Sequence, residues 1–222
     1  MQRNNEDTGG ADHWYTSAME TATSFDIFHT ALLGMDCQAG IVSVYAKPPE
    51  EFVQRASSVL KAARRSGMPV ILVEVGFRPG LPEVSGNNKL FAAIKANPQH
   101  QQFFQSASGA IHPSLGPEPG DIVVTKHRIS AFPGTDLQMI LRARDIHTLV
   151  LFGIATGGVV LSTLLEACDA DYRVAVIADC CADLDEELHN ALVHRLFPVR
   201  GEVITAGDFV KALEAARAAY RW

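Results

Sequence analysis

The stretch LVLFGIATGGVVLSTLLEA, residues 149–167, decides the fold. It opens with a short, continuous apolar run, which predicts a buried strand, and the glycines that follow predict a turn. Helical periodicity then extends over residues 159–170. A strand, a glycine turn and a helix in this order are typical of the place where open α/β sheets hold ligands. We therefore expect a functional site at this turn.

Similar apolar runs recur along the chain and alternate with helical patterns. The runs predict strands at 30–36, 68–75, 121–125, 147–153 and 172–179, with a weaker strand at 201–206. They are nearly continuous, as expected for strands covered on both faces. Helices are predicted at 50–67, 135–145, 159–170, 185–197 and 208–220. This alternation predicts an α/β fold, a three-layer α/β/α sandwich of the Rossmann type with a six-stranded, mainly parallel sheet.

The length and composition fit a single core. With 222 residues, 47% of them apolar, we expect one domain over residues 26–222. Residues 1–25 are polar and lack periodicity, so they are predicted to form an extension that is disordered or packs on a neighbour. The segment 77–120 is rich in proline and is predicted to be a long, decorated crossover between strands, of the kind that often lines sites.

Charge and hydropathy favour a small-molecule partner. The net charge of −6 gives no basic footprint for nucleic acid. No apolar run reaches the roughly 18 residues of a membrane span, and the first residues carry no signal pattern, so we expect no membrane partner and a cytoplasmic protein. The four cysteines lack CxxC spacing, so we expect no thiolate metal site; Cys180 and Cys181 are assigned structural roles, and Cys37 is not expected to be catalytic.

Two ionisable residues follow predicted strands at the same edge of the sheet. Asp36 lies in LLGMDCQ and Lys126 in VVTKHRISAF. Since the carboxyl ends of parallel strands converge, we expect both to meet the turn at 154–159. Either residue alone is more often a cap or a solvated side chain. Together, Lys126 would hold the Asp36 carboxylate ionised and oriented while Asp36 carries protons.

These segments together resemble the isochorismatase-like hydrolases, whose cysteine members carry an Asp, a Lys and a GxxTxxCV motif. The resemblance covers nearly all of the chain from Phe28 onward and includes the DxQ pair of Asp36 and Gln38. The motif runs here through Gly153, Thr156, Val159 and Val160, and the Lys126 block continues through Ser130, Ala131, Phe132, Thr135 and Leu137. Val159 therefore stands at the position of the nucleophilic cysteine, and its side chain has no lone pair to attack a carbonyl.

The resemblance also implies features of the turn and of the assembly. It implies a cis peptide between Ile154 and Ala155, turn amides near Ala155 and Val159 that act as an oxyanion hole, and a homodimer or homotetramer. The glycine at Gly158 would let a ligand approach the backbone closely. Gln38, as part of the family's DxQ pair, is assigned to substrate binding.

Further side chains have two interpretations each. Arg78 could bind a substrate carboxylate or be an exposed arginine, and Phe77 and Phe132 could form apolar walls or belong to the core. His127 should face away from the site by strand alternation. A serine or threonine one turn beyond Val159, Ser162 or Thr163, could replace the thiol only if a base reached it.

Two departures from the family decide the functional hypotheses. The nicotinamidase branch carries an Asp and His metal cluster after the second strand, but VEVGFRPG has no nearby histidine, so we predict no metal and no cofactor. True isochorismatases lack the cysteine and protonate a vinyl ether, yet usually have glycine where this chain has Val159. Our leading hypothesis is a hydrolase acting on a small organic molecule by a noncovalent mechanism dependent on Asp36 and Lys126. The alternative is an inactive member that serves as a small-molecule binding or oligomeric scaffold protein.

Overall fold

The computed structural model describes residues 24–219 and has a six-stranded parallel sheet at its centre. The order across the sheet is β3-β2-β1-β4-β5-β6, and every neighbouring pair is parallel. The strands are β1 (Thr30–Met35), β2 (Val70–Val75), β3 (Ile122–Lys126), β4 (Thr148–Ile154), β5 (Arg173–Ala182) and β6 (Glu202–Ile204). The predicted α/β fold is thus confirmed.

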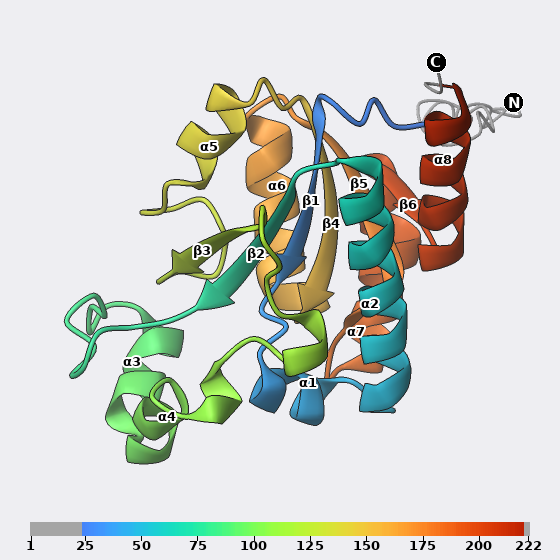
Figure 1. The fold of residues 1–222 in the computed structure, drawn as a ribbon. Coiled ribbons are helices and arrows are strands. Elements are labelled where there is room, and N and C mark those ends of the chain that lie inside the picture. The colour runs from blue at the N-terminus through green and yellow to red at the C-terminus, as the bar shows by residue number, and fades with distance from the viewer. Residues whose placement is uncertain (1–23, 220–222) are drawn as a thin grey trace, which may run out of the picture.

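Helices cover both faces of the sheet (Figure 1). They are α1 (Ala39–Tyr45), α2 (Pro49–Ser66), α3 (Lys89–Ala96), α4 (Pro98–Phe103), α5 (Leu137–Ala143), α6 (Leu161–Asp169), α7 (Glu186–Ala191) and α8 (Ala206–Ala219). Helices α2 and α8 lie side by side on one face, and α5 and α6 lie on the other. None of the helices in residues 24–219 combines the length and the hydropathy that a membrane span needs.

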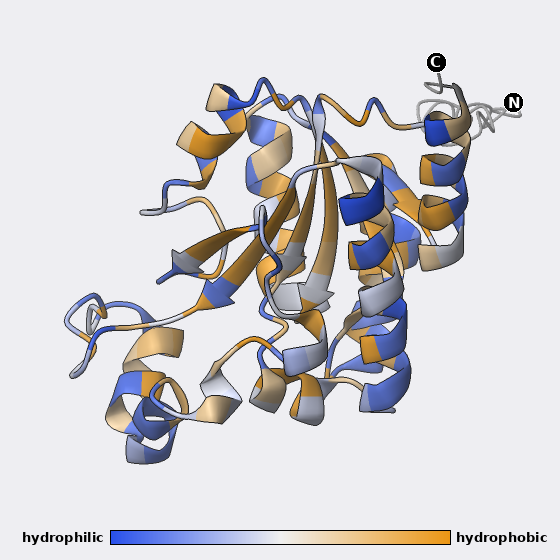
Figure 2. Ribbon diagram, in the orientation of Figure 1, coloured by the Kyte–Doolittle hydropathy of each residue, from blue (hydrophilic) through white to orange (hydrophobic). Residues whose placement is uncertain are grey.

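The core lies between the sheet and these helices. All six residues of β1 are buried, and the strands form the hydrophobic centre of Figure 2. Residues 1–23 of the predicted extension lie outside the described residues. The chain joins the core by Phe25, which is buried and packs edge-on against Phe209 of α8.

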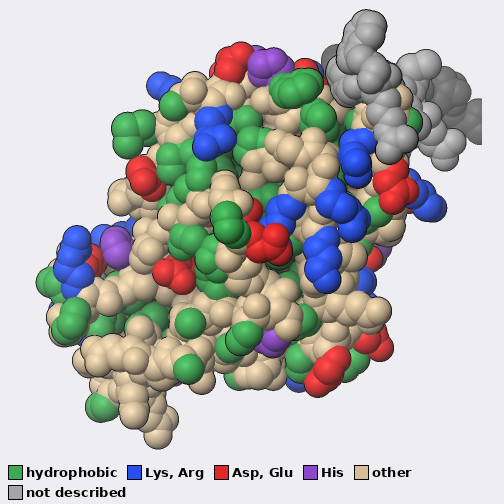
Figure 3. All heavy atoms as spheres, in the orientation of Figure 1, with side chains coloured by type: hydrophobic (Ala, Val, Ile, Leu, Met, Phe, Trp, Pro, Cys, Tyr) green, Lys and Arg blue, Asp and Glu red, His purple; other side chains and the backbone are tan. Residues whose placement is uncertain are grey.

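The outer surface over α2 and α8 is charged. Lysine and arginine side chains gather over these two helices, with acidic side chains among them (Figure 3). Below this surface, the largely buried Arg64 of α2 pairs through its guanidinium with Asp121 at 2.6 Å and with Glu118 at 2.7 Å. Interspersed charges of both signs are typical of a solvated face.

The structure departs from the predicted elements in two places. Helices α1, α3 and α4 were not predicted, and the latter two lie inside the crossover that was read as a decorated loop. The predicted helix at 159–170 also starts later. A single π-helical turn, η4 (Thr156–Val160), precedes α6, and Gly158 within it has non-helical dihedrals (φ −104, ψ −106). Glycine tolerates this conformation at little steric cost.

Candidate active site

An ion pair lies at the carboxyl edge of the sheet. Asp36 directly follows β1 and Lys126 ends β3, so the parallel strands bring both residues to the same edge. The Lys126 Nζ is 2.9 Å from the Asp36 Oδ2, and the two residues are only 2% and 6% exposed. The structure thus brings these two predicted site residues together in a buried position.

Burial brings the pKa of the Asp36 carboxyl group closer to neutral. Desolvation raises the pKa of Asp36 from 3.8 to about 6, although the neighbouring Lys126 ammonium lowers it. Its Oδ1 is buried and has no hydrogen-bond partner among the described residues. The Lys126 ammonium also donates to the Arg128 carbonyl at 3.0 Å, which fixes its direction. One carboxylate oxygen is therefore held by the lysine, while the other is buried without a hydrogen-bond partner.

The turn after β4 completes this edge. The peptide bond between Ile154 and Ala155 is cis, as the family resemblance implied, and Val159 is 3% exposed. The amides of Gly158 and Val160 both donate to the Ala155 carbonyl, at 3.1 and 3.3 Å. These two amides are therefore already satisfied, and an oxyanion hole at the amides of Ala155 and Val159 stays a prediction.

The opposite side of the turn is held by side chains from the segment after β5. The Gly157 amide donates to the Asp183 carboxylate at 2.7 Å. The buried Thr156 hydroxyl lies 2.8 Å from the His189 Nδ1. Burial lowers the pKa of His189, which favours the neutral imidazole. These contacts with Asp183 and His189 hold the turn on the side opposite Asp36 and Lys126.

A cavity of about 640 Å³ opens in front of the ion pair and the turn. Its floor comes from the sheet edge, and its walls come from α1, α3 and α4. Most lining side chains are aliphatic or aromatic, and the ionisable acid and base groups among them are Asp36, Lys126 and His100. The remaining floor residues are Val75, Ile154, Ala155, Gly158 and Val159, and the walls include Ile41, Val44, Tyr45, Leu90, Phe91, Ile94, Phe103, Phe104 and Ile129.

Gln38 does not line this cavity, although it was predicted to bind substrate. Its side chain is fully buried and contacts the backbone at two separate places. The amide nitrogen donates to the carbonyls of Val75, at 3.0 Å, and of Gly109, while Oε1 accepts from the Val75 amide at 3.0 Å. The structure therefore gives Gln38 a positioning role at the base of the cavity wall.

Three other predicted binding residues also lie outside the lining. Arg78 is exposed and pairs with Glu83. Phe77 packs edge-on against two other phenylalanines in a small cluster beside the cavity. Phe132 is buried in the main core and stacks on Tyr172 with ring centroids 6.2 Å apart. Each thus follows the structural alternative that the sequence had left open.

Neither of the hydroxyls one helical turn beyond Val159 lines the cavity. The Thr163 hydroxyl is fully buried and accepts a hydrogen bond from the Ala131 amide at 3.0 Å, so it is turned away from the cavity. Neither Ser162 nor any cysteine is among the residues that line the cavity. The pKa of Cys37 is raised by burial, which keeps it a thiol. His127 contacts the Gly76 carbonyl and also lies outside the lining, as predicted from strand alternation.

Sequence reasoning missed the residues of the cavity walls. The signal for α3 was present, because Asn88 precedes the pattern KLFAAIKA and its side chain caps the Phe91 amide at 3.1 Å. Asn97 followed by Pro98 likewise marks the start of α4. Helix α1 has seven residues and no side-chain cap, so its sequence carried little signal.

Comparisons with known proteins agree on one family. The isochorismatase domain family matches residues 30–208. An isochorismatase family protein from Burkholderia thailandensis has a similar structure, with a TM-score of 0.76, 32% identity and coverage of 87% of this chain and 100% of that one.

Curated relatives point the same way. The uncharacterised isochorismatase family protein YecD of Escherichia coli O157:H7 is 33% identical, over 83% of this chain and 96% of its own length. The ureidoacrylate amidohydrolase RutB of Methylobacterium radiotolerans is 34% identical, over 72% of this chain and 67% of its own length.

Proposed function

This chain belongs to the isochorismatase-like family of cysteine hydrolases, and from that premise we propose that it hydrolyses a small, uncharged and largely apolar molecule without forming a covalent intermediate. The observation that carries the proposal is the buried ion pair of Asp36 and Lys126 facing a cavity beside Val159. A carboxylate and an ammonium are costly to keep in an apolar cavity, and they are useful there for proton transfer.

Water takes the part of the nucleophile in this proposal, because the Val159 side chain has no atom that can attack. The Asp36 carboxylate, which lines the cavity, accepts a proton from water while the water oxygen bonds to the carbonyl carbon of an amide. The tetrahedral intermediate then collapses, the C–N bond breaks, and the protonated Asp36 returns its proton to the leaving nitrogen. Lys126 holds the carboxylate in place through both steps.

The cavity lining supports an uncharged, apolar substrate. Among its described residues, Lys126 is the one lysine or arginine, and its charge is already paired with Asp36. A substrate carboxylate would find no unpaired cation on these walls except a protonated His100. The aromatic side chains of Phe103 and Phe104 instead offer large apolar surface. We therefore propose aryl or branched alkyl amides in preference to carboxylated ones.

The second candidate function is a binding or scaffold protein that no longer turns over substrate. Val159, buried at the position of the family's nucleophile, is the observation that favours it. Such a protein would bind apolar molecules in the same cavity but release no product. Our expectations of a cytoplasmic location and of a homodimer or homotetramer remain predictions, and light scattering of the purified chain tests the second.

The first experiment measures product formation by mass spectrometry from isochorismate and from matched pairs of neutral and carboxylated amides. The proteins are wild type, Asp36→Asn and Val159→Cys, with Val159→Ala as the control for volume. Turnover by wild type that disappears in Asp36→Asn and persists in Val159→Ala supports water as the nucleophile. Binding without turnover by wild type, with amidase activity appearing only in Val159→Cys, favours the scaffold function.

The pH profile of kcat/KM separates the two proton-transfer roles that Asp36 can have. If Asp36 is the general base, activity rises as pH increases through about 6, where the carboxyl group ionises. The opposite profile, with activity lost through the same range, would assign Asp36 as a general acid and exclude the proposed attack by base-activated water.

A further inference from the structure

A second group of ionisable side chains lies at the amino ends of the strands, opposite the carboxyl ends that border the cavity. His29 immediately precedes β1 and His147 immediately precedes β4, and these strands are neighbours with Thr30 paired to Thr148. The amides of His147 and Thr148 both donate to the His29 carbonyl, at 2.9 and 3.1 Å. Asp145 lies in the turn between α5 and β4. Strand pairing therefore fixes the backbones of the two histidines side by side.

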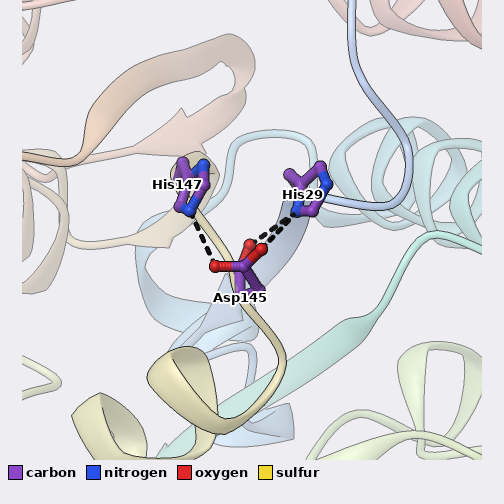
Figure 4. A group of neighbouring side chains, drawn as sticks. All are labelled: His29, Asp145 and His147. Carbon is purple, nitrogen blue, oxygen red and sulfur yellow. Dashed lines mark hydrogen bonds and ion pairs between the residues drawn. The ribbon is translucent and has the colours of Figure 1, made fainter.

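The three side chains converge on one another (Figure 4). The Asp145 carboxylate lies between the two imidazoles, with Oδ1 at 2.9 Å from the His147 Nε2 and Oδ2 at 3.4 Å from the His29 Nδ1. The His29 Nδ1 is also 2.8 Å from the Asp145 carbonyl oxygen. The rings are nearly parallel, at 8° with centroids 5.2 Å apart. Each imidazole thus turns a nitrogen to the same carboxylate.

Although the sequence led us to predict no metal, we propose that His29, Asp145 and His147 form a binding site for a divalent transition metal ion such as Zn²⁺, separate from the cavity at Asp36. One ligand atom from each side chain lies within 4.8 Å of the other two. Zinc bonds to imidazole nitrogen and carboxylate oxygen are about 2.0–2.2 Å long, so ligand atoms around a tetrahedral ion are roughly 3.4 Å apart. The two nitrogen–oxygen distances, 2.9 Å to Oδ1 and 3.4 Å to Oδ2, are close to this separation, with one carboxylate oxygen facing each imidazole.

The surroundings of the group also suit a metal ion. Two neutral imidazoles and one carboxylate are the ligand set of many zinc sites, with water in the fourth position. The side chains of His29, His147 and Asp145 are 38%, 55% and 72% exposed, so an ion can enter without opening the fold. Binding would displace any proton shared in the present hydrogen bonds and would replace those bonds with metal bonds.

The bound ion would link the residues that precede the two central strands, β1 and β4. It would join the start of β1 to the turn before β4, two segments that are 116 residues apart along the chain. An ion that binds only the folded chain raises its stability. Since the cavity lies at the opposite edge, the bound ion would raise the stability of the folded chain and leave the cavity unchanged.

The test is a calorimetric Zn²⁺ titration of metal-free protein, together with thermal unfolding in ZnCl2 and in EDTA. The variants are His147→Gln and Asp145→Asn, with His194→Gln, an exposed histidine outside the group, as the matched control. We expect one Zn²⁺ per chain and, at about 100 times the Kd, a rise in Tm of roughly 5–10 °C.

The affinity for Zn²⁺ should fall by at least about tenfold in His147→Gln and in Asp145→Asn, and should be unchanged in His194→Gln. Co²⁺ in place of Zn²⁺ should give the intense visible absorption of a tetrahedral site in wild type and lose it in His147→Gln. The proposal is overturned if wild type binds no Zn²⁺, or if the affinity of His147→Gln equals that of wild type. Because these side chains are exposed, circular dichroism should show that all the variants fold.

Discussion

Replacing Lys126 by methionine should destabilise the protein in a way that depends on pH. The substitution removes the ammonium that lies 2.9 Å from the Asp36 carboxylate and keeps a side chain of similar length. Asp36 is 6% exposed, so hydration compensates for the lost partner only in part. Removing one member of a buried ion pair typically costs about 3–5 kcal/mol, because the remaining charge stays buried without compensation.

The sign of the pH dependence follows from the raised pKa of Asp36. Its pKa of about 6 in the folded chain exceeds the usual 3.8, so the folded state binds this proton more tightly than the unfolded state. The corresponding stability, about 3 kcal/mol in total, is fully present below the unfolded pKa and is lost as pH rises through 6. Without the ammonium, the pKa of Asp36 rises further and the loss extends to higher pH.

Urea unfolding followed by circular dichroism measures the effect at about pH 5 and about pH 8. At the higher pH, Lys126→Met should cost about 3–5 kcal/mol. At the lower pH, Asp36 is mostly protonated in both proteins, and the cost should fall below about 1 kcal/mol. The control is Asp36→Asn combined with Lys126→Met, which carries no titrating group here. Equal costs at both pH values in Lys126→Met would refute the reasoning.

Three further substitutions test how the chain builds the site. Gly153→Ala should prevent folding or cost more than about 4 kcal/mol, since its φ is +148° and a Cβ would lie 2.1 Å from the Met35 carbonyl oxygen; soluble expression and Tm measure this. Gln38→Met should cost about 2–4 kcal/mol in urea unfolding because three partly buried backbone groups lose their partner. Thr163→Val should cost about 1–3 kcal/mol by leaving the Ala131 amide unsatisfied, and amide exchange at Ala131 should quicken if the bond is as described.

The sheet and the floor of the cavity were predictable from the sequence, and the walls were not. Continuous apolar runs identify buried parallel strands, and the carboxyl ends of such strands share an edge, so Asp36, Lys126 and the turn at 154–159 could be placed together. The walls depend on short helices, which have few residues to show a period. Helix α1 spans Ala39–Tyr45 without a side-chain cap.

Four of the predicted binding residues do not line the cavity, for a common physical reason. Gln38, Phe77, Arg78 and Phe132 were chosen by type and position, but neighbouring segments use their side chains in other ways. A glutamine whose amide is consumed by backbone groups has no donor left for a ligand. Such partners come from residues far away along the chain, and sequence patterns do not reveal them.

The contacts of Gln38 hold together the two ends of the segment 76–108, which contains α3 and α4. One side chain holds Val75, where the chain leaves the sheet, and Gly109, where it returns after α3 and α4. The segment 76–108 therefore begins and ends beside the same side chain. Because the sheet and Gln38 hold these two ends together, the segment itself does not have to bring them together. A segment with coincident ends can be transplanted between relatives while the sheet edge stays in place. Exchanging this one continuous piece of chain would accordingly replace the cavity walls that α3 and α4 form and leave the ion pair of Asp36 and Lys126 in place.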